Sequence, residues 1–108
     1  MDRKKELKEL YKQTKSEMGI FAVQAKDGGY CFLETTKNLK GKINSTRFQL
    51  QLGSHPNKDL QQKWNELGEE AFEIAVLEKL EYDKDESKTD YSEELSIMKM
   101  LWDARLKA

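Results

Sequence analysis

Six basic side chains in the central part of the sequence have the chemistry to contact phosphate groups. They are Lys37, Lys40, Lys42, Arg47, Lys58 and Lys63. Lysine and arginine bind the phosphate backbone of nucleic acids through their charge and N–H donors, without reading the bases. Lysines are equally common on ordinary solvated surfaces, so both interpretations stay open at this point.

The charge of the whole chain is unevenly distributed. Residues 1–65 hold 13 Lys/Arg against 7 Asp/Glu, a net +6, whereas residues 66–108 hold 6 against 13, a net −7. The positive half is suited to a phosphate backbone, and the acidic half would repel it. A chance asymmetry of a solvated surface is the alternative, because strong non-specific binders of nucleic acid are usually more basic overall.

Other reactive groups are isolated. His55 is the only histidine, and it lies in a Gly-Ser-His-Pro turn. A zinc site needs several ligands, and no catalytic triad is convincing around one isolated histidine. We therefore expect a polar contact that stabilises the turn. Cys31 is the only cysteine, which excludes an internal disulfide, and we expect it to be a small residue of the core.

The size and composition predict one globular domain. The chain has 108 residues, of which 36% are charged and 37% are apolar. Its apolar runs are only a few residues long, so we expect no membrane span and no signal peptide. A single cysteine fits a reducing compartment, and we expect a cytoplasmic location.

An amphipathic helix is predicted at the start of the chain, ahead of the main domain. Leu7, Leu10 and Tyr11 recur at helical spacing, and lysines occupy the other faces. We assign residues 1–17 to this helix and residues 18–108 to the domain.

Hydrophobic spacing and turn residues predict the elements of that domain. In chain order they are strands at about 19–25 and 30–35, helices at 37–51 and 58–67, and a strand at 71–80. Asn57 is expected to cap the second helix, Gly53 to end the first and Gly68 to end the second as a left-handed residue. The residues expected to face the core are Leu39, Ile43, Phe48 and Leu52, then Leu60, Trp64 and Leu67, then Phe72, Ile74, Val76 and Glu78.

A polar loop over 81–90 leads to the last helix, which is predicted to begin near Asp90. Lys99 lies within or beside the inward stripe, so its ammonium extends to solvent or points into a polar pocket at the sheet. The whole order predicts an α/β fold with a small three-stranded, mainly antiparallel sheet flanked by helices. The inward stripe of the last helix consists of Leu95, Met98, Trp102 and Leu106.

The segments from the hairpin onward resemble the GIY-YIG nuclease family over about residues 18–106. The sequence GIF at 19–21 stands for the first motif, and FLE at 32–34 stands for the second. The stretches TTKNLKGKINSTRF and GSHPNKDLQQKWNELGEEAFEIAVLE follow in the order of the family's later segments. The resemblance implies a GIY-YIG-type fold and an endonuclease that cuts phosphodiesters with one divalent ion, Mg²⁺ or Mn²⁺.

This sequence departs from the family pattern at nearly every implied catalytic position. Phe21 and Phe32 replace tyrosines whose hydroxyls orient the attacking water, and phenylalanine has no hydroxyl. Glu34 stands in place of a glycine that allows close approach of the substrate. The catalytic positions that the resemblance implies are Phe21, Phe32, Lys42, Arg47 and Lys99.

The charged positions differ as well. Lys42 replaces an arginine and loses its bidentate guanidinium, and Lys99 replaces the carboxylate that binds the metal. Thr46 stands where relatives have histidine, and Arg47 takes that role if the alignment shifts by one residue. Since Glu34 and Lys99 are opposite charges at site positions, we hypothesise that they form an ion pair across the former site.

We therefore expect a nuclease-like domain that is catalytically inactive and keeps a role in binding nucleic acid, DNA in the first place, or in regulation. No cofactor is expected, and a bacterial or phage-like cytosol is the expected setting. One alternative is an altered endonuclease that uses Mg²⁺ or Mn²⁺, with Glu34 or Glu94 as a ligand. Another is a protein-interaction module that uses the emptied site or the acidic loop 81–90.

Overall fold

A three-stranded antiparallel sheet forms the middle layer of the structure, a computed structural model that describes residues 16–85 and 87–107. The central strand β1 (Met18–Ala25) pairs with β2 (Cys31–Thr36) on one side and β3 (Phe72–Leu80) on the other. The predicted α/β class and three-stranded sheet are confirmed. The predicted helix over residues 1–17 lies almost wholly outside the described residues.

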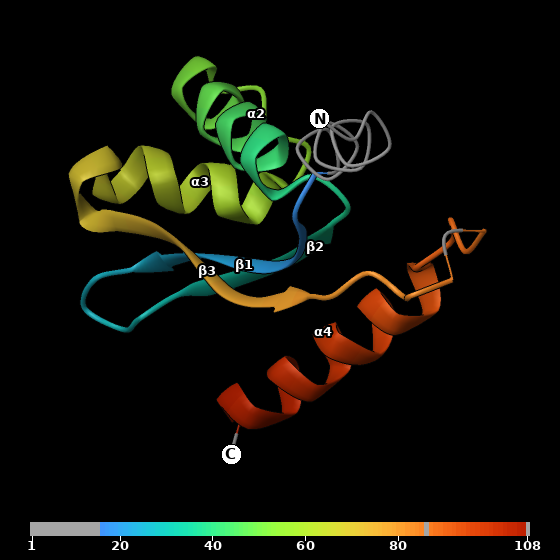
Figure 1. The fold of residues 1–108 in the computed structure, drawn as a ribbon. Coiled ribbons are helices and arrows are strands. Elements are labelled where there is room, and N and C mark those ends of the chain that lie inside the picture. Colours follow the sequence, from blue (N-terminus) through green and yellow to red (C-terminus); the bar gives the residue numbers. More distant parts are fainter. Residues whose placement is uncertain (1–15, 86, 108) are drawn as a thin grey trace, which may run out of the picture.

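Helices cover both faces of this sheet (Figure 1). The helices α2 (Leu39–Leu52) and α3 (Lys58–Leu67) lie on one face, and α4 (Ser92–Lys107) lies on the other. A short 3-10 turn, Glu69–Ala71, leads from α3 into β3. Within the described part of the chain, no helix is long and apolar enough to cross a bilayer.

Local capping explains where the two central helices begin and end. The Asn57 side chain accepts a hydrogen bond from the backbone N–H of Leu60 at 3.1 Å, so the predicted cap is confirmed. Gly53 ends α2 in the left-handed conformation with φ 76° and ψ 22°. Gly68 ends α3 through its N–H bond to Trp64, but at ψ 156° it is not the predicted left-handed helical residue.

Both faces of β1 are buried, so the core has two halves. The half under α2 and α3 contains Phe21, Val23 and Ala25, and the half over α4 contains Ile20 and Ala22. A strand alternates its side chains between faces, which allows one segment to anchor both layers. Cys31 was expected in the core, yet it is exposed at the start of the edge strand β2.

Some predicted core positions on the helices face solvent instead. On α2 the buried residues are Leu39, Thr46 and Leu50, whereas Phe48 and Leu52 are exposed. Phe48 follows Leu39 by nine residues, which is roughly half a turn away around a helix of 3.6 residues per turn. The same exposure is found at two further predicted core residues, Leu67 and Leu106.

A β-bulge in β3 changes which face its last residues take. Ile20 pairs with Glu78 and Phe21 pairs with Val76, so one extra residue is inserted into β3 between these pairs. Glu78 therefore lies on the α4 face, where its carboxylate accepts a hydrogen bond from the Trp102 indole at 2.8 Å. The predicted alternation of Phe72, Ile74, Val76 and Glu78 on a single face is wrong at its last member.

The close approach of β1 and β3 explains the glycine of the first motif. A β-carbon at Gly19 would lie 2.1 Å from the carbonyl oxygen of Glu78. Backbone cannot yield as a flexible side chain can, so only glycine allows β1 and β3 to approach this closely.

Candidate functional site

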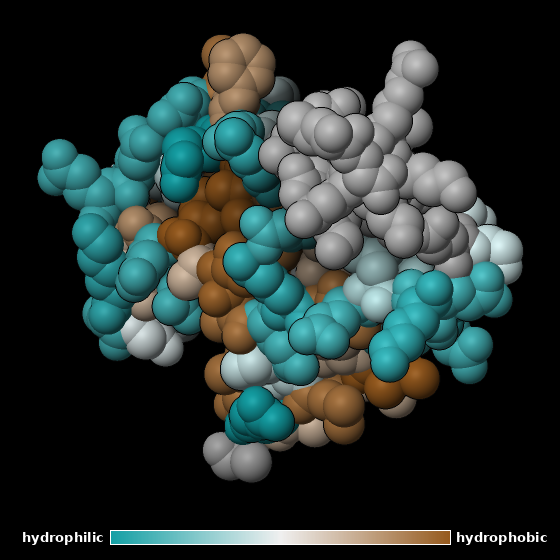
Figure 2. Space-filling view, in the orientation of Figure 1, coloured by the Kyte–Doolittle hydropathy of each residue, from teal (hydrophilic) through white to brown (hydrophobic). Residues whose placement is uncertain are grey.

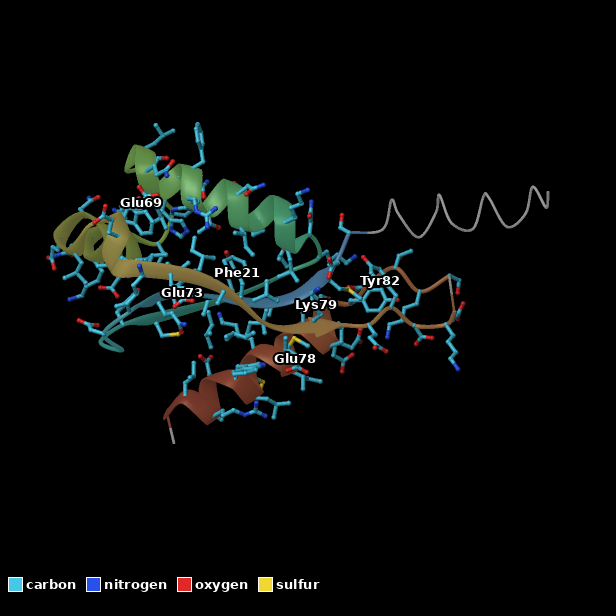
Figure 3. All side chains as sticks on the ribbon, turned by 60° about the vertical axis from the view of Figure 1, so that its left-hand side comes forward. Phe21, Glu69, Glu73, Glu78, Lys79 and Tyr82 are labelled. Atoms are coloured by element: carbon cyan, nitrogen blue, oxygen red, sulfur yellow. The ribbon has the colours of Figure 1, made fainter. Side chains whose placement is uncertain are left out.

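The two motif phenylalanines lie on the face of the sheet that α2 covers. Figure 3 shows Phe21 between β1 and α2, and its side chain is 0% exposed, packed in one core with Leu39 and Leu50. Phe32 comes from the neighbouring strand β2 and is partly buried at the edge of that core. Its ring meets the ring of His55 edge to face, with centroids 5.7 Å apart.

An ion pair lies next to these rings. Glu34 follows Phe32 by two residues, so both side chains leave β2 on the same face. Lys42 extends from the first turns of α2, and its Nζ lies 3.8 Å from Oε1 of Glu34. Both side chains are partly exposed, so the pair contributes only about 0–1 kcal/mol to stability. The other carboxylate oxygen, Oε2, is buried and has no hydrogen-bond partner in the structure.

The proposed pairing of Glu34 with Lys99 is wrong. Leu33 packs against Met98 of α4, so the next residue, Glu34, leaves the strand on the opposite face toward α2. Lys99 is exposed on α4, beyond the other face of the sheet, and extends to solvent. Lys42 thus provides the counter-ion that Lys99 was expected to provide.

Thr46, rather than Arg47, faces the site. Thr46 lies one helical turn after Lys42 and is fully buried, and its hydroxyl has no hydrogen-bond partner in the structure. Arg47 is exposed on the outer side of α2. The alternative alignment, in which Arg47 would take the role of the family histidine, therefore finds no support in the geometry.

His55 belongs to the same cluster, which sequence reasoning missed. The expected turn contact is confirmed, because Nδ1 of His55 accepts a hydrogen bond from the N–H of Asn57 at 3.0 Å. The backbone N–H of His55 donates a hydrogen bond to the side-chain oxygen of Gln61 at 3.0 Å. These bonds hold the ring against Phe32. The signal was present in GSHPN, where the family resemblance also has a histidine.

The environment of His55 favours its neutral form. Burial lowers the pKa of the imidazole below its ordinary value, and the nearby Lys42 acts in the same direction. The carboxylate of Glu34 and the hydrogen bond from Asn57 oppose this shift, but burial is the largest effect.

The stability of the fold is expected to depend on His55 in mildly acidic solution. The pKa of His55 in the folded chain is lowered from about 6.5, so its contribution is complete above that pH. It declines as the pH falls from 6.5 through the lower pKa of the folded state. Because the chain has one histidine, His55→Gln is expected to flatten the stability profile just below pH 6.5, measured by urea unfolding. An unchanged profile in the variant would contradict this assignment.

The residues present do not fit the divalent ion that the family resemblance implies. Among residues 16–85 and 87–107, no group of three or more His, Cys, Asp or Glu side chains is placed to hold a metal. Glu34 faces the ammonium of Lys42, and Lys99 is itself a cation. Glu94, in the first turn of α4, pairs with Lys88 at 3.1 Å.

The basic residues separate into exposed and engaged groups. Lys40 and Arg47 are exposed about two turns apart on the outer side of α2, and Lys58 is exposed at the start of α3; we call these three the basic surface. Lys42 is paired with Glu34, and Lys63 is partly buried.

The stretch of sequence that carries the basic surface contains little acid, although Glu66 lines the same groove as Lys58. Lys37, just before α2, donates a hydrogen bond to the carbonyl of Thr89. Between residues 37 and 65 Asp59 is the only acidic residue, against six basic ones. A groove of about 490 Å³ adjoins Lys58, and it is lined among others by His55, Gln61 and Asn65.

Solved structures with the same arrangement are known. The chain is similar to the catalytic domain of homing endonuclease I-TevI, with a TM-score of 0.67 and 21% identity over 83% of this chain and 88% of that one. A mutant of the catalytic domain of intron endonuclease I-TevI has a TM-score of 0.54 and 24% identity, covering 74% and 84% of the two chains. No family model and no curated protein matches the sequence. These likenesses establish the architecture, and the chain accordingly has the GIY-YIG-like fold.

Proposed function

We propose that this chain is a nuclease-like domain that binds nucleic acid, in the first place double-stranded DNA, and does not cleave it. The observation that carries the proposal is the content of the site. Where the family resemblance implies two tyrosine hydroxyls, Phe21 and Phe32 add apolar surface to the core. Where it implies a glycine and an arginine, Glu34 and Lys42 pair with each other.

This content lacks the groups that the family resemblance implies for phosphodiester cleavage. Loss of one preorganised polar group typically lowers a catalysed rate by about 10²–10³. Here two hydroxyls are replaced by hydrocarbon, and the Glu34 carboxylate faces an ammonium. Both changes support a site without catalytic function.

Binding is supported by the basic surface. Lys40, Arg47 and Lys58 are exposed on the helical layer. Most acidic residues of the second half of the chain lie on β3, the following loop and α4, although Glu66, Glu69 and Glu70 lie at the end of α3 and in the turn after it. Because α4 lies on the opposite face of the sheet, its acidic residues are separated from the basic surface by the sheet (Figure 1). A phosphate backbone along α2 would therefore meet mainly positive charge.

The proposal is tested by binding and cleavage assays on the same preparation. Duplex and branched DNA are expected to bind at about 50 mM salt, with an affinity that falls steeply as salt is raised. No nicking is expected with Mg²⁺ or Mn²⁺. Cleavage that Glu34→Ala abolishes would favour an altered endonuclease, and absence of binding even at low salt would favour a protein-interaction module. We place this function in the cytoplasm, with which the single cysteine is consistent.

A further inference from the structure

The helix α4 is apolar on two opposite faces. Its inner face packs under the sheet through Leu95 and Met98, supported by Trp102. Its outer face consists of Ile97, Met100, Leu101 and Ala104, which recur at spacings of three and four residues. Ile97, Met100 and Leu101 are 49%, 69% and 62% exposed. Figure 2 shows hydrophobic side chains along the lower edge of the molecule, over α4.

The outer face of α4 is not part of the hydrophobic core of a single chain. A surface helix that packs on one sheet needs one apolar stripe, and its opposite side is normally polar. Single exposed apolar residues are common, but a continuous stripe of this kind marks a surface that another molecule covers. The stripe therefore calls for a partner with a matching apolar face.

We propose that a second copy of this chain covers the outer face, with the two α4 helices packed antiparallel about a two-fold axis between Met100 and Leu101. In this register Ile97 of one copy faces Ala104 of the other. A large side chain thus meets a small one on both sides of the axis, which allows the helices to approach closely.

Charge supports the antiparallel direction. The first turn of α4 carries Glu93 and Glu94, of which Glu94 also pairs with Lys88. The last two turns carry Arg105, which lies over the Trp102 ring, and one acid, Asp103. Antiparallel packing brings the acidic start of each helix near the basic end of the other. It also places the partial positive charge at the N-terminus of each helix near the partial negative charge at the C-terminus of the other, which is favourable. A parallel arrangement would place like charges together.

The size of the face sets the strength of the contact. A pair of four-turn helices buries an area in the range below about 1,200 Å², which is typical of weak and transient complexes. We therefore expect reversible dimers near 100 μM and monomers near 1 μM. Because α4 and α2 cover opposite faces of the sheet, the contact leaves the basic surface free.

Sedimentation analysis of the full chain tests the proposal. Leu101→Glu places a charge at the axis and is expected to raise the dimer dissociation constant at least 10-fold. Phe48→Glu is the matched control, because Phe48 is exposed to the same extent, 61% against 62%, but lies on α2. A wild-type chain that is monomeric at 100 μM, or a Phe48→Glu effect as large as that of Leu101→Glu, would overturn the proposal.

Cysteine pairing tests the direction of the helices. In a Cys31→Ser background, an Ile97→Cys chain mixed with an Ala104→Cys chain is expected to form disulfide-linked heterodimers under mild oxidation. Each variant alone should link much less. Preferential linking of each variant to itself would indicate parallel packing and overturn the antiparallel register. Phe48→Cys in the same background is expected to stay unlinked.

Discussion

Phe21→Ala is expected to lower the free energy of unfolding by about 3–5 kcal/mol. The Phe21 ring is fully buried on the central strand and packs against Leu39 and Leu50 of α2. Its removal leaves a cavity between the sheet and a helix, which β1 cannot close because its other face is held against α4. Chemical unfolding followed by circular dichroism measures the loss.

Phe48→Ala is the matched control for this prediction, since it removes the same atoms from an exposed position. With Phe48 61% exposed, the change in stability is expected to stay within about 0.5 kcal/mol. Comparable losses in the two variants would mean that Phe21 is not the core residue that the packing indicates. Such a result would also weaken the proposal that Phe21, at a catalytic position of the family pattern, now contributes to the core.

The order of the elements was predictable because local signals were strong. The hairpin of β1 and β2 has a Gly-containing turn between two apolar runs, and Asn57 marks the start of α3 by its capping chemistry. Boundaries agree within a few residues. These features depend on neighbours in the sequence, which a single chain reveals.

The errors arose where distant segments decide the outcome. The β-bulge opposite Ile20 moves Glu78 to the other face of the sheet, and no local pattern in β3 indicates it. On α2 the inward stripe passes through Thr46 and not Phe48, because helical spacing from Leu39 places Phe48 on the opposite side. Hydrophobicity alone favoured the wrong face there.

Only some of the residues that the structure brings together at the candidate site were predicted, and their contacts were not. Phe21, Phe32 and Lys42 lie on one side of the sheet, as the family resemblance implied. Lys99 lies on the other side, because α4 covers the face of the sheet on which Leu33 packs. Strand alternation then turns Glu34 to the opposite face, where Lys42 of α2 is its partner. For His55 the signal was the match of GSHPN to a histidine in the family resemblance, but that match did not indicate burial beside Phe32.

Reversal of two charges on the basic surface is expected to have the largest effect on binding. The double variant Lys40→Glu with Arg47→Glu is predicted to lower the affinity for duplex DNA at least 10-fold at about 50 mM salt. Each lost phosphate contact removes about 0.9 from the slope of log K against log salt, so the slope should fall by about 2. Fluorescence anisotropy across a salt series, without divalent ions, measures both quantities.

The control must change the net charge equally at another place. The double variant Lys26→Glu with Lys99→Glu changes the net charge by the same amount. It replaces two exposed lysines by glutamates, one in the hairpin turn and one on α4. If DNA lies along α2, this second pair alters the affinity much less and leaves the slope unchanged, because long-range repulsion is screened beyond about 10 Å at 0.1 M salt. Equal losses in both double variants would instead mean that binding follows total charge. The basic surface would then have no special role, and the nucleic-acid proposal would lose its structural support.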